Sequence, residues 1–114
     1  MSEKQKLLIV DDSELNRDIL KEILGSRYDY MEAENGTQAI QILEVHPEID
    51  LMLLDINMPQ MNGFQVLEHM RELQWIDEIP VVMISSEESV EIMRKAYDLG
   101  ITDYISRPFD AVIV

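Results

Sequence analysis

Four short, nearly continuous apolar runs recur along the chain and constrain its fold more than any other feature. They are Leu7–Val10, Leu51–Leu54, Val81–Ile84 and the shorter pair Tyr104–Ile105. Runs of this length without polar alternation are typical of strands buried on both faces, as in a parallel sheet. The segment Tyr28–Glu34 mixes tyrosines with acids, which indicates a strand at the edge of the same sheet.

Segments with helical periodicity fill the gaps between these runs. They are Leu15–Leu24 with Ser13 as N-cap and Gly25 as a stop, Gly36–His46, Phe64–Leu73, and Val90–Tyr97 followed by Gly100. Strand and helix therefore alternate up to a fifth strand near Thr102–Ser106. This order predicts an α/β fold, a doubly wound parallel sheet with right-handed crossovers and helices on both faces.

The length of 114 residues fits one domain over residues 1–114. After Pro108 the chain reads Phe109–Val114, which is only the first turn or two of a fifth helix. We therefore expect a truncated fifth helix and an N-terminal fragment of a longer protein.

The charge of the chain limits the partners that it can have. The sequence holds 9 basic and 23 acidic residues, a formal charge of -14, which argues against contact with nucleic acid or an anionic membrane. No apolar run approaches the ~18 residues of a membrane span, and no signal peptide is apparent, so we expect a cytoplasmic protein. The absence of cysteine excludes thiolate metal sites and a cysteine nucleophile.

Polar residues follow four of the five predicted strands, at the point where each strand ends. Asp11 and Asp12 follow the first run, Asp55 ends the second, Ser85 follows the third, and Arg107 follows the fifth. The carboxyl ends of parallel strands meet at one edge of the sheet, where such folds bind their ligands. Three carboxylates repel one another there, and Mg²⁺, which prefers oxygen ligands, would remove that conflict. The set suits phosphoryl transfer onto a carboxylate.

Taken singly, these residues have ordinary explanations. Asp12 suits a helix cap, Ser85 suits a cap of the fourth predicted helix, and Arg107 suits an exposed surface. Their joint occurrence at one sheet edge favours a functional site. No GxxxxGK or GxGxxG motif occurs, which disfavours a nucleotide-binding site.

Four motifs together resemble the receiver domains of two-component response regulators over essentially the whole chain. They are Leu-Ile-Val-Asp11-Asp12, Leu-Leu-Asp55-Ile-Asn-Met-Pro-Gln-Met-Asn-Gly63, Val-Met-Ile-Ser85-Ser86, and Asp103-Tyr104-Ile105-Ser106-Arg107-Pro108-Phe109. The resemblance implies a flavodoxin-like sheet with strand order 2-1-3-4-5.

The resemblance also implies a role for each matching residue. Asp55 would accept a phosphoryl group from a sensor histidine kinase or a phosphotransfer protein. Asp11, Asp12, Asp55 and the backbone carbonyl of Asn57 would bind Mg²⁺. Ser85 would be the switch hydroxyl and Tyr104 the switch aromatic. Tyr104 fits equally well as an ordinary half-buried strand tyrosine without a switch role. Phosphorylation would then change the surface made by the fourth helix, the fifth strand and the fifth helix.

Two further positions bear on the lifetime of a phosphoryl group. Arg107 stands where the family normally has lysine. The guanidinium of arginine is a planar fork on a longer side chain, whereas the ammonium of lysine is a compact charge. We expect phosphorylation to survive this change and switching or phosphoryl lifetime to differ. Glu87 and Asn57 would flank an attacking water, although Glu87 equally suits the first turn of a helix.

The sequence is compatible with three functions. The first is the phosphorylated switch, which is not an enzyme beyond its own phosphorylation and dephosphorylation. It would have a C-terminal effector domain as a further partner and form homodimers through the surface named above. The second is a pseudo-receiver that binds proteins without phosphorylation. The third is a Mg²⁺-dependent aspartyl phosphatase or phosphotransferase, disfavoured because Asn57 stands where that class needs a second acid.

Overall fold

The computed structural model describes residues 4–56, 58, 61–75, 78–85 and 90–106. Over these residues strands and helices alternate. They are β1 (Gln5–Val10), α1 (Glu14–Leu24), β2 (Tyr28–Ala33), α2 (Gly36–Val45), β3 (Leu51–Asp55), α3 (Gly63–Glu72), β4 (Val81–Ser85), α4 (Val90–Asp98) and β5 (Asp103–Ser106). The predicted alternation is therefore confirmed, and the predicted fifth helix falls on residues outside the described ones.

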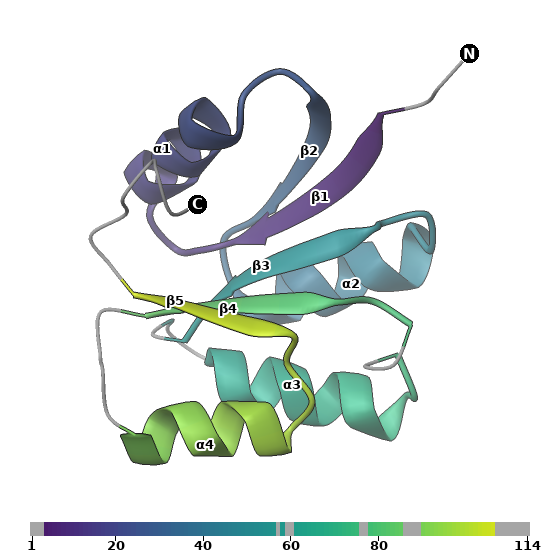
Figure 1. The fold of residues 1–114 in the computed structure, drawn as a ribbon. Coiled ribbons are helices and arrows are strands. Elements are labelled where there is room, and N and C mark those ends of the chain that lie inside the picture. Colours follow the sequence, from purple (N-terminus) through teal and green to yellow (C-terminus); the bar gives the residue numbers. More distant parts are fainter. Residues whose placement is uncertain (1–3, 57, 59–60, 76–77, 86–89, 107–114) are drawn as a thin grey trace.

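The described strands form one parallel sheet of five with the order β2-β1-β3-β4-β5. This is the flavodoxin-like order that the resemblance implied, with β2 at an edge as predicted. The chain passes from β1 to β2 on one side and then crosses to β3 on the other side of β1 (Figure 1). The strand order therefore reverses between β1 and β3.

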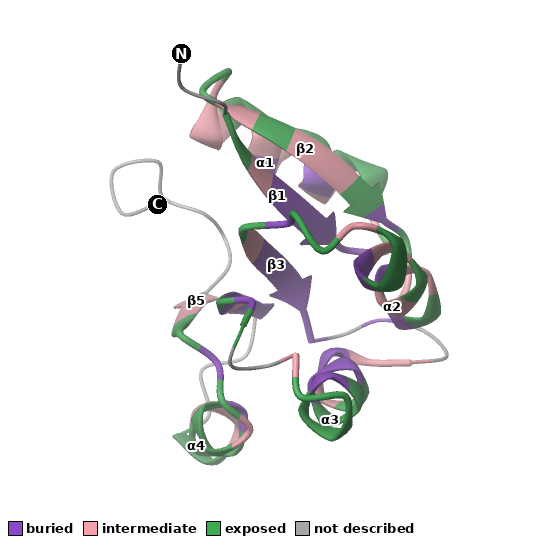
Figure 2. Cartoon of the chain, turned by 90° about the vertical axis from the view of Figure 1, so that its right-hand side faces the viewer, coloured by how far each residue is buried: buried purple, intermediate pink, exposed green. Residues whose placement is uncertain are grey.

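Two apolar cores lie on opposite faces of the sheet. On one face, α2, α3 and α4 pack against side chains such as Leu8, Leu54 and Met83. On the other face, α1 contributes Leu20 to a smaller core around Ile9. Figure 2 shows the consequence, since β1 and β3 are buried where they approach the carboxyl edge. The central strands are thus held from both sides, which fixes the residues at their ends.

Local signals explain where α1 begins and ends. Ser13 is its N-cap, and the Ser13 hydroxyl accepts a hydrogen bond of 3.3 Å from the Asn16 amide. Gly25 ends the helix at φ 83°, a conformation that favours glycine. Leu15, although it fits the helical apolar spacing, is 68% exposed, because it points away from the face that carries Leu20.

In the described part of the chain, no helix is both long and apolar enough to cross a membrane.

Candidate functional site

Three carboxylates meet where the strand order reverses. Asp11 follows β1 directly, Asp12 is the next residue, and Asp55 is the last residue of β3. Val10 and Leu54 are register partners in the β1–β3 pair, so Asp11 and Asp55 leave the two strands at the same level. The buried apolar runs therefore deliver these acids to one place, as the sequence predicted.

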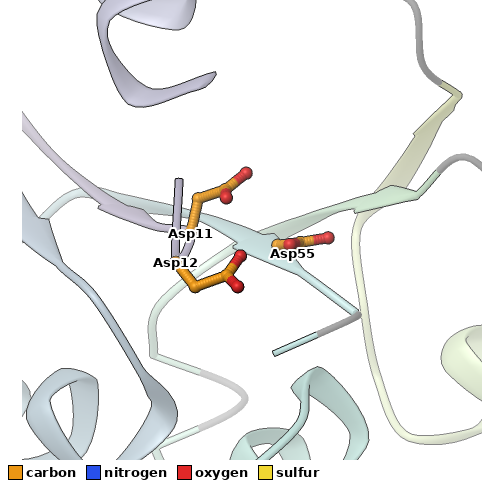
Figure 3. Close-up of side chains that lie close together, drawn as sticks. All are labelled: Asp11, Asp12 and Asp55. Atoms are coloured by element: carbon orange, nitrogen blue, oxygen red, sulfur yellow. The ribbon is translucent and has the colours of Figure 1, made fainter. Parts of the chain in front are cut away.

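One oxygen from each of Asp11, Asp12 and Asp55 lies within 4.8 Å of the other two (Figure 3). Mg²⁺–oxygen distances of about 2.1 Å put octahedral ligands about 3 Å apart in cis and about 4.2 Å apart in trans. The spacing therefore suits a shared hard cation. The oxygen-only donor set also suits Mg²⁺, and no thiolate or imidazole in this cluster favours a softer metal.

Two of the three carboxylates in this cluster are buried, which raises the cost of keeping their negative charges close together. Asp11 and Asp55 are each 1% exposed, whereas Asp12 is exposed. Buried like charges repel strongly because water screens them little. A divalent cation would offset that repulsion, and the exposed side of Asp12 leaves a route from solvent.

Hydrogen bonds fix the backbone and side chain of Asp11. The Asp11 amide donates to the Ala33 carbonyl at 3.1 Å, which ties it to β2. Its Oδ1 accepts from the Ser13 amide at 2.9 Å. Its carbonyl accepts from Arg17 Nη1 at 2.6 Å. The position of this acid is thus set from β2, from the start of α1 and from within α1.

The backbone around Asp55 is held by β4 and α3. Ile56, the next residue, donates its amide to the Ile84 carbonyl at 3.1 Å and accepts at its own carbonyl from the Gly63 amide at 2.9 Å. A Cβ on Gly63 would lie 2.7 Å from the Asp55 carbonyl oxygen. Only glycine lets α3 begin this close to the end of β3.

Ser85 and Tyr104 lie on the two strands beyond Asp55. Ser85 is fully buried at the end of β4, one residue past Ile84, the register partner of Asp55. Tyr104 is half-buried on β5, pairs with Met83 and packs against the core that includes α4. Paired and alternate residues share a face, so Ser85 and Tyr104 lie on the same face of the sheet. The predicted roles of Asn57, Glu87 and Arg107 concern residues outside the described ones.

Arg17 is a residue of this site that the sequence reasoning missed. It is only 7% exposed, and it joins α1 to the Asp11 carbonyl. Its position three residues before Leu20 places it on the buried face of α1, and this spacing was the signal available in the sequence.

Comparison with known proteins gives a consistent match. The family model for the response regulator receiver domain matches residues 7–112. Chemotaxis protein CheY1 of Helicobacter pylori is 37% identical over 106 residues, covering 91% of this chain and 86% of that protein. Two-component response regulator ORR3 of Oryza sativa is 32% identical, covering 90% of this chain and 79% of that protein.

A solved structure agrees in fold as well. A chain of the CheX–CheY–BeF3–Mg²⁺ complex from Borrelia burgdorferi superposes with a TM-score of 0.88 at 29% identity, covering 96% of this chain and 82% of that one.

Proposed function

Because this chain belongs to the response regulator receiver family, whose domains are phosphoacceptors in two-component signalling, we propose that Asp55 is the phosphorylated residue. The observation that carries this proposal is the position of Asp55. It is buried at the end of β3, with oxygens of Asp11 and Asp12 within 4.8 Å. Asp11 and Asp12 flank the strand-order reversal with it, but Asp55 alone belongs to β3 and to the most specific family motif.

Asp11, Asp12 and Asp55 would hold Mg²⁺, with the Asn57 carbonyl as a further ligand. The ion would supply positive charge to the oxygens of an incoming phosphoryl group. The residues of the chain do the positioning. Hydrogen bonds at its amide, its Oδ1 and its carbonyl hold Asp11, and the strand that carries it holds Asp55. The Borrelia CheX–CheY complex contains Mg²⁺ together with BeF3, which supports this choice of metal.

The reaction is a transfer between two nucleophiles. A carboxylate oxygen of Asp55 attacks the phosphorus of a phosphohistidine on a sensor kinase or phosphotransfer protein. A new O–P bond forms as the N–P bond breaks, and the imidazole nitrogen keeps the electron pair of that bond. The product is an acyl phosphate on Asp55. Hydrolysis returns the carboxylate and inorganic phosphate, with Glu87 and Asn57 as candidates to orient the water.

Ser85 and Tyr104 would couple the phosphoryl group to the surface. Ser85 lies one register position beyond Asp55, and its hydroxyl can donate to a phosphoryl oxygen. Tyr104 lies on the same face of the sheet as Ser85 and packs against the core to which α4 contributes Ala96. A phosphoryl group that draws Ser85 inward would thus favour one position of Tyr104 and of the α4–β5 surface. The cation of Arg107 would meet the remaining phosphoryl charge.

The partners follow from this switch. The donor would be a sensor histidine kinase or phosphotransfer protein, and the readout a homodimer or an effector domain acting through the α4–β5 surface. The Borrelia CheY structure contains CheX as a bound protein, which is one example of such a partner for a relative.

Incubation with acetyl phosphate and Mg²⁺, followed by intact-mass analysis, tests the proposal. We expect a mass gain of one phosphoryl group that Asp55→Asn abolishes. Asp29→Asn, which changes an exposed aspartate on the edge strand β2, should leave the gain intact. Arg107→Lys should alter the decay of the label or the conformational response, and identical behaviour would remove any special role for the arginine.

The same experiment separates the alternatives. No labelling with any phosphodonor would favour a pseudo-receiver that binds proteins without phosphorylation. Multiple-turnover hydrolysis of varied phosphate esters would favour a phosphatase or phosphotransferase.

A further inference from the structure

Arg17 is a buried cation that the proposed chemistry does not use. Its side chain is 8% exposed, although arginine seldom lies this deep without partners. It occupies the first turns of α1, and its own amide donates to the Ser13 carbonyl at 3.1 Å. The N-cap of the helix and the guanidinium are therefore part of one rigid segment that begins beside the acid pair.

The guanidinium joins the residue that follows β1 to strand β2. Its Nη1 donates to the Asp11 carbonyl at 2.6 Å, and its Nε donates to Glu32 Oε1 on β2 at 2.9 Å. Glu32 also pairs through Oε2 with Lys21 at 3.0 Å. The planar fork of arginine serves both acceptors in fixed directions, which the single ammonium of lysine does not.

The Asp11 carbonyl belongs to the peptide that joins Asp11 to Asp12. The preceding peptide is held by the bond from the Asp11 amide to Ala33. Arg17 therefore fixes the second peptide plane, and with it the direction in which Asp12 leaves the strand. Loss of this bond would remove one restraint on the rotation of the peptide, and that rotation would move the Asp12 carboxylate relative to Asp11 and Asp55.

We propose that Arg17 is a positioning residue for the metal site, holding the Asp11–Asp12 peptide so that the carboxylates converge on a divalent cation. This inference rests on the proposed function, because it assumes that the site binds Mg²⁺. It concerns the placement of ligands, and Arg17 itself touches neither the ion nor the phosphoryl group.

The direction in which Mg²⁺ affinity changes when Arg17 is replaced distinguishes a positioning role from a purely electrostatic one. A buried cation near a metal site repels Mg²⁺, so removing a charge that acted only through its field would tighten metal binding. Removing a positioning group weakens it. Glu32 already partners the guanidinium. Burial raises the pKa of Glu32, but the hydrogen bonds from Lys21 and Arg17 outweigh it and lower that pKa, so this carboxylate stays charged.

Titration of the ¹⁵N-labelled full chain with MgCl₂, followed by NMR shifts of the Asp11, Asp12 and Asp55 amides, tests the proposal below the melting temperature of each variant. We expect Arg17→Met to weaken Mg²⁺ binding by about tenfold, as other groups that orient metal ligands do. Arg17→Lys keeps the charge but loses the fork, and it should weaken binding by a smaller factor.

Two controls isolate the mechanism. Lys21→Met removes a neighbouring charge that pairs with Glu32 without touching Asp11, and it should bind Mg²⁺ like the wild type. Gly25→Ala destabilises the far end of α1 through its φ of 83° and should also bind normally. Loss of affinity in both controls would indicate a general effect of charge or stability and would contradict the proposal.

The outcomes are distinct from those for the proposed function. If the wild type shows no Mg²⁺-dependent shifts, the metal site itself is wrong. If the wild type binds and Arg17→Met binds equally or more tightly, only the positioning role is wrong. If Arg17→Met does not fold, Arg17→Lys decides, and wild-type affinity in that variant would overturn the inference.

Discussion

At the scale of single residues, Gly63 decides how closely α3 can approach Asp55. A Cβ there would lie 2.7 Å from the Asp55 carbonyl oxygen and 2.9 Å from the Ile56 Cα. Both contacts are to backbone, which cannot move aside as a flexible side chain can. We therefore expect Gly63→Ala to lower the free energy of unfolding by about 1–3 kcal/mol. It should also slow acetyl phosphate labelling of the folded protein, because Asp55 must shift.

Gly25→Ala is the matched control for this prediction. Nothing lies within 4 Å of a Cβ at Gly25, so the change acts only through its φ of 83°. We expect a loss of about 1–2 kcal/mol with unchanged labelling per folded molecule. Urea unfolding and intact-mass kinetics measure the two effects separately. Equal labelling rates in both glycine variants would show that the α3 contact does not affect the site.

The residues also show where sequence reasoning reached its limit. Asp11, Asp12 and Asp55 could be found because each follows an apolar run, and strand ends converge whatever the surrounding side chains are. Arg17 could not be assigned in this way, because a charged residue on a helix is exposed in most proteins. Its acceptors are Glu32 and the Asp11 backbone carbonyl, and a backbone carbonyl cannot be recognised as a partner from a sequence pattern.

At the scale of elements, Lys95 and Phe64 connect α4 to α3. The Lys95 ammonium lies 4.5 Å from the centroid of the Phe64 ring. Ala96 is the one fully buried residue of α4, and Ile92 packs against the core while partly exposed, so a contact at the surface can add to the stability of this helix. Phe64 directly follows Gly63, the residue that packs against the Asp55 backbone, so the contact lies next to the functional site.

A double-mutant cycle with Lys95→Met and Phe64→Leu measures that connection. We expect a coupling free energy of about 0.5–1 kcal/mol, the range for a cation over an aromatic face near the surface. Urea unfolding of the wild type, both single variants and the double variant provides the four values. Strict additivity would mean that the ammonium and the ring do not stabilise the pair of helices.

Glu48 links the loop after α2 to β1, and its contribution to the stability of the fold depends on pH. Glu48 accepts hydrogen bonds from His46, from its own backbone amide and from Lys6, and these bonds, in that order of size, lower its pKa from 4.5 to about 2. A carboxyl group with a lowered pKa in the folded state stabilises the fold above its unfolded pKa. That contribution should therefore be complete above pH 4.5 and be lost as the pH falls toward 2.

The measurement compares the wild type with Glu48→Gln. Glutamine keeps the size and an acceptor oxygen but cannot ionise, so the stability difference should shrink between about pH 6 and about pH 3. The group is exposed, and about 1 M NaCl should reduce the difference at the higher pH by screening. A difference that is independent of both pH and salt would contradict the ionic contribution of Glu48.

The strand elements followed their apolar runs closely because burial on both faces leaves little alternative to a central strand. The apolar spacing predicted less reliably which face of each helix is buried. Leu15 and Val90 fit helical spacing yet are 68% and 67% exposed. Spacing identifies a helix, but the direction of its buried face depends on which neighbour it packs against, and that is a property of the assembled fold.

At the scale of the whole molecule, topology explains why the site lies where it does. The order β2-β1-β3-β4-β5 makes the chain leave β1 on one side and return as β3 on the other. The helices that follow β1 and β3 therefore diverge to opposite faces and leave the carboxyl ends uncovered. The acid pair after β1 and the acid that ends β3 border that opening, so a ligand can reach a site whose carboxylates are mostly buried.

The net charge of -14 makes the same fold sensitive to ions. Any salt should stabilise the domain by screening repulsion among its acids. Mg²⁺ should add a specific effect, because it would bind the folded cluster of Asp11, Asp12 and Asp55 and not the unfolded chain. At about ten times its dissociation constant, that binding adds about 1.4 kcal/mol to the free energy of unfolding.

Thermal or urea unfolding in MgCl₂ and in NaCl of equal ionic strength separates the two effects. Asp12→Asn removes one of three repelling charges, so it should raise stability without Mg²⁺ and reduce the gain that Mg²⁺ gives. Asp29→Asn changes the net charge equally on exposed β2 and should keep the full Mg²⁺ gain. If MgCl₂ and NaCl stabilise the wild type equally, or if Asp12→Asn keeps the whole gain, the acid cluster contributes only to the general charge of the surface. If only chains with all three acids gain stability from Mg²⁺, the strand order has brought together carboxylates whose mutual repulsion is relieved by a bound cation.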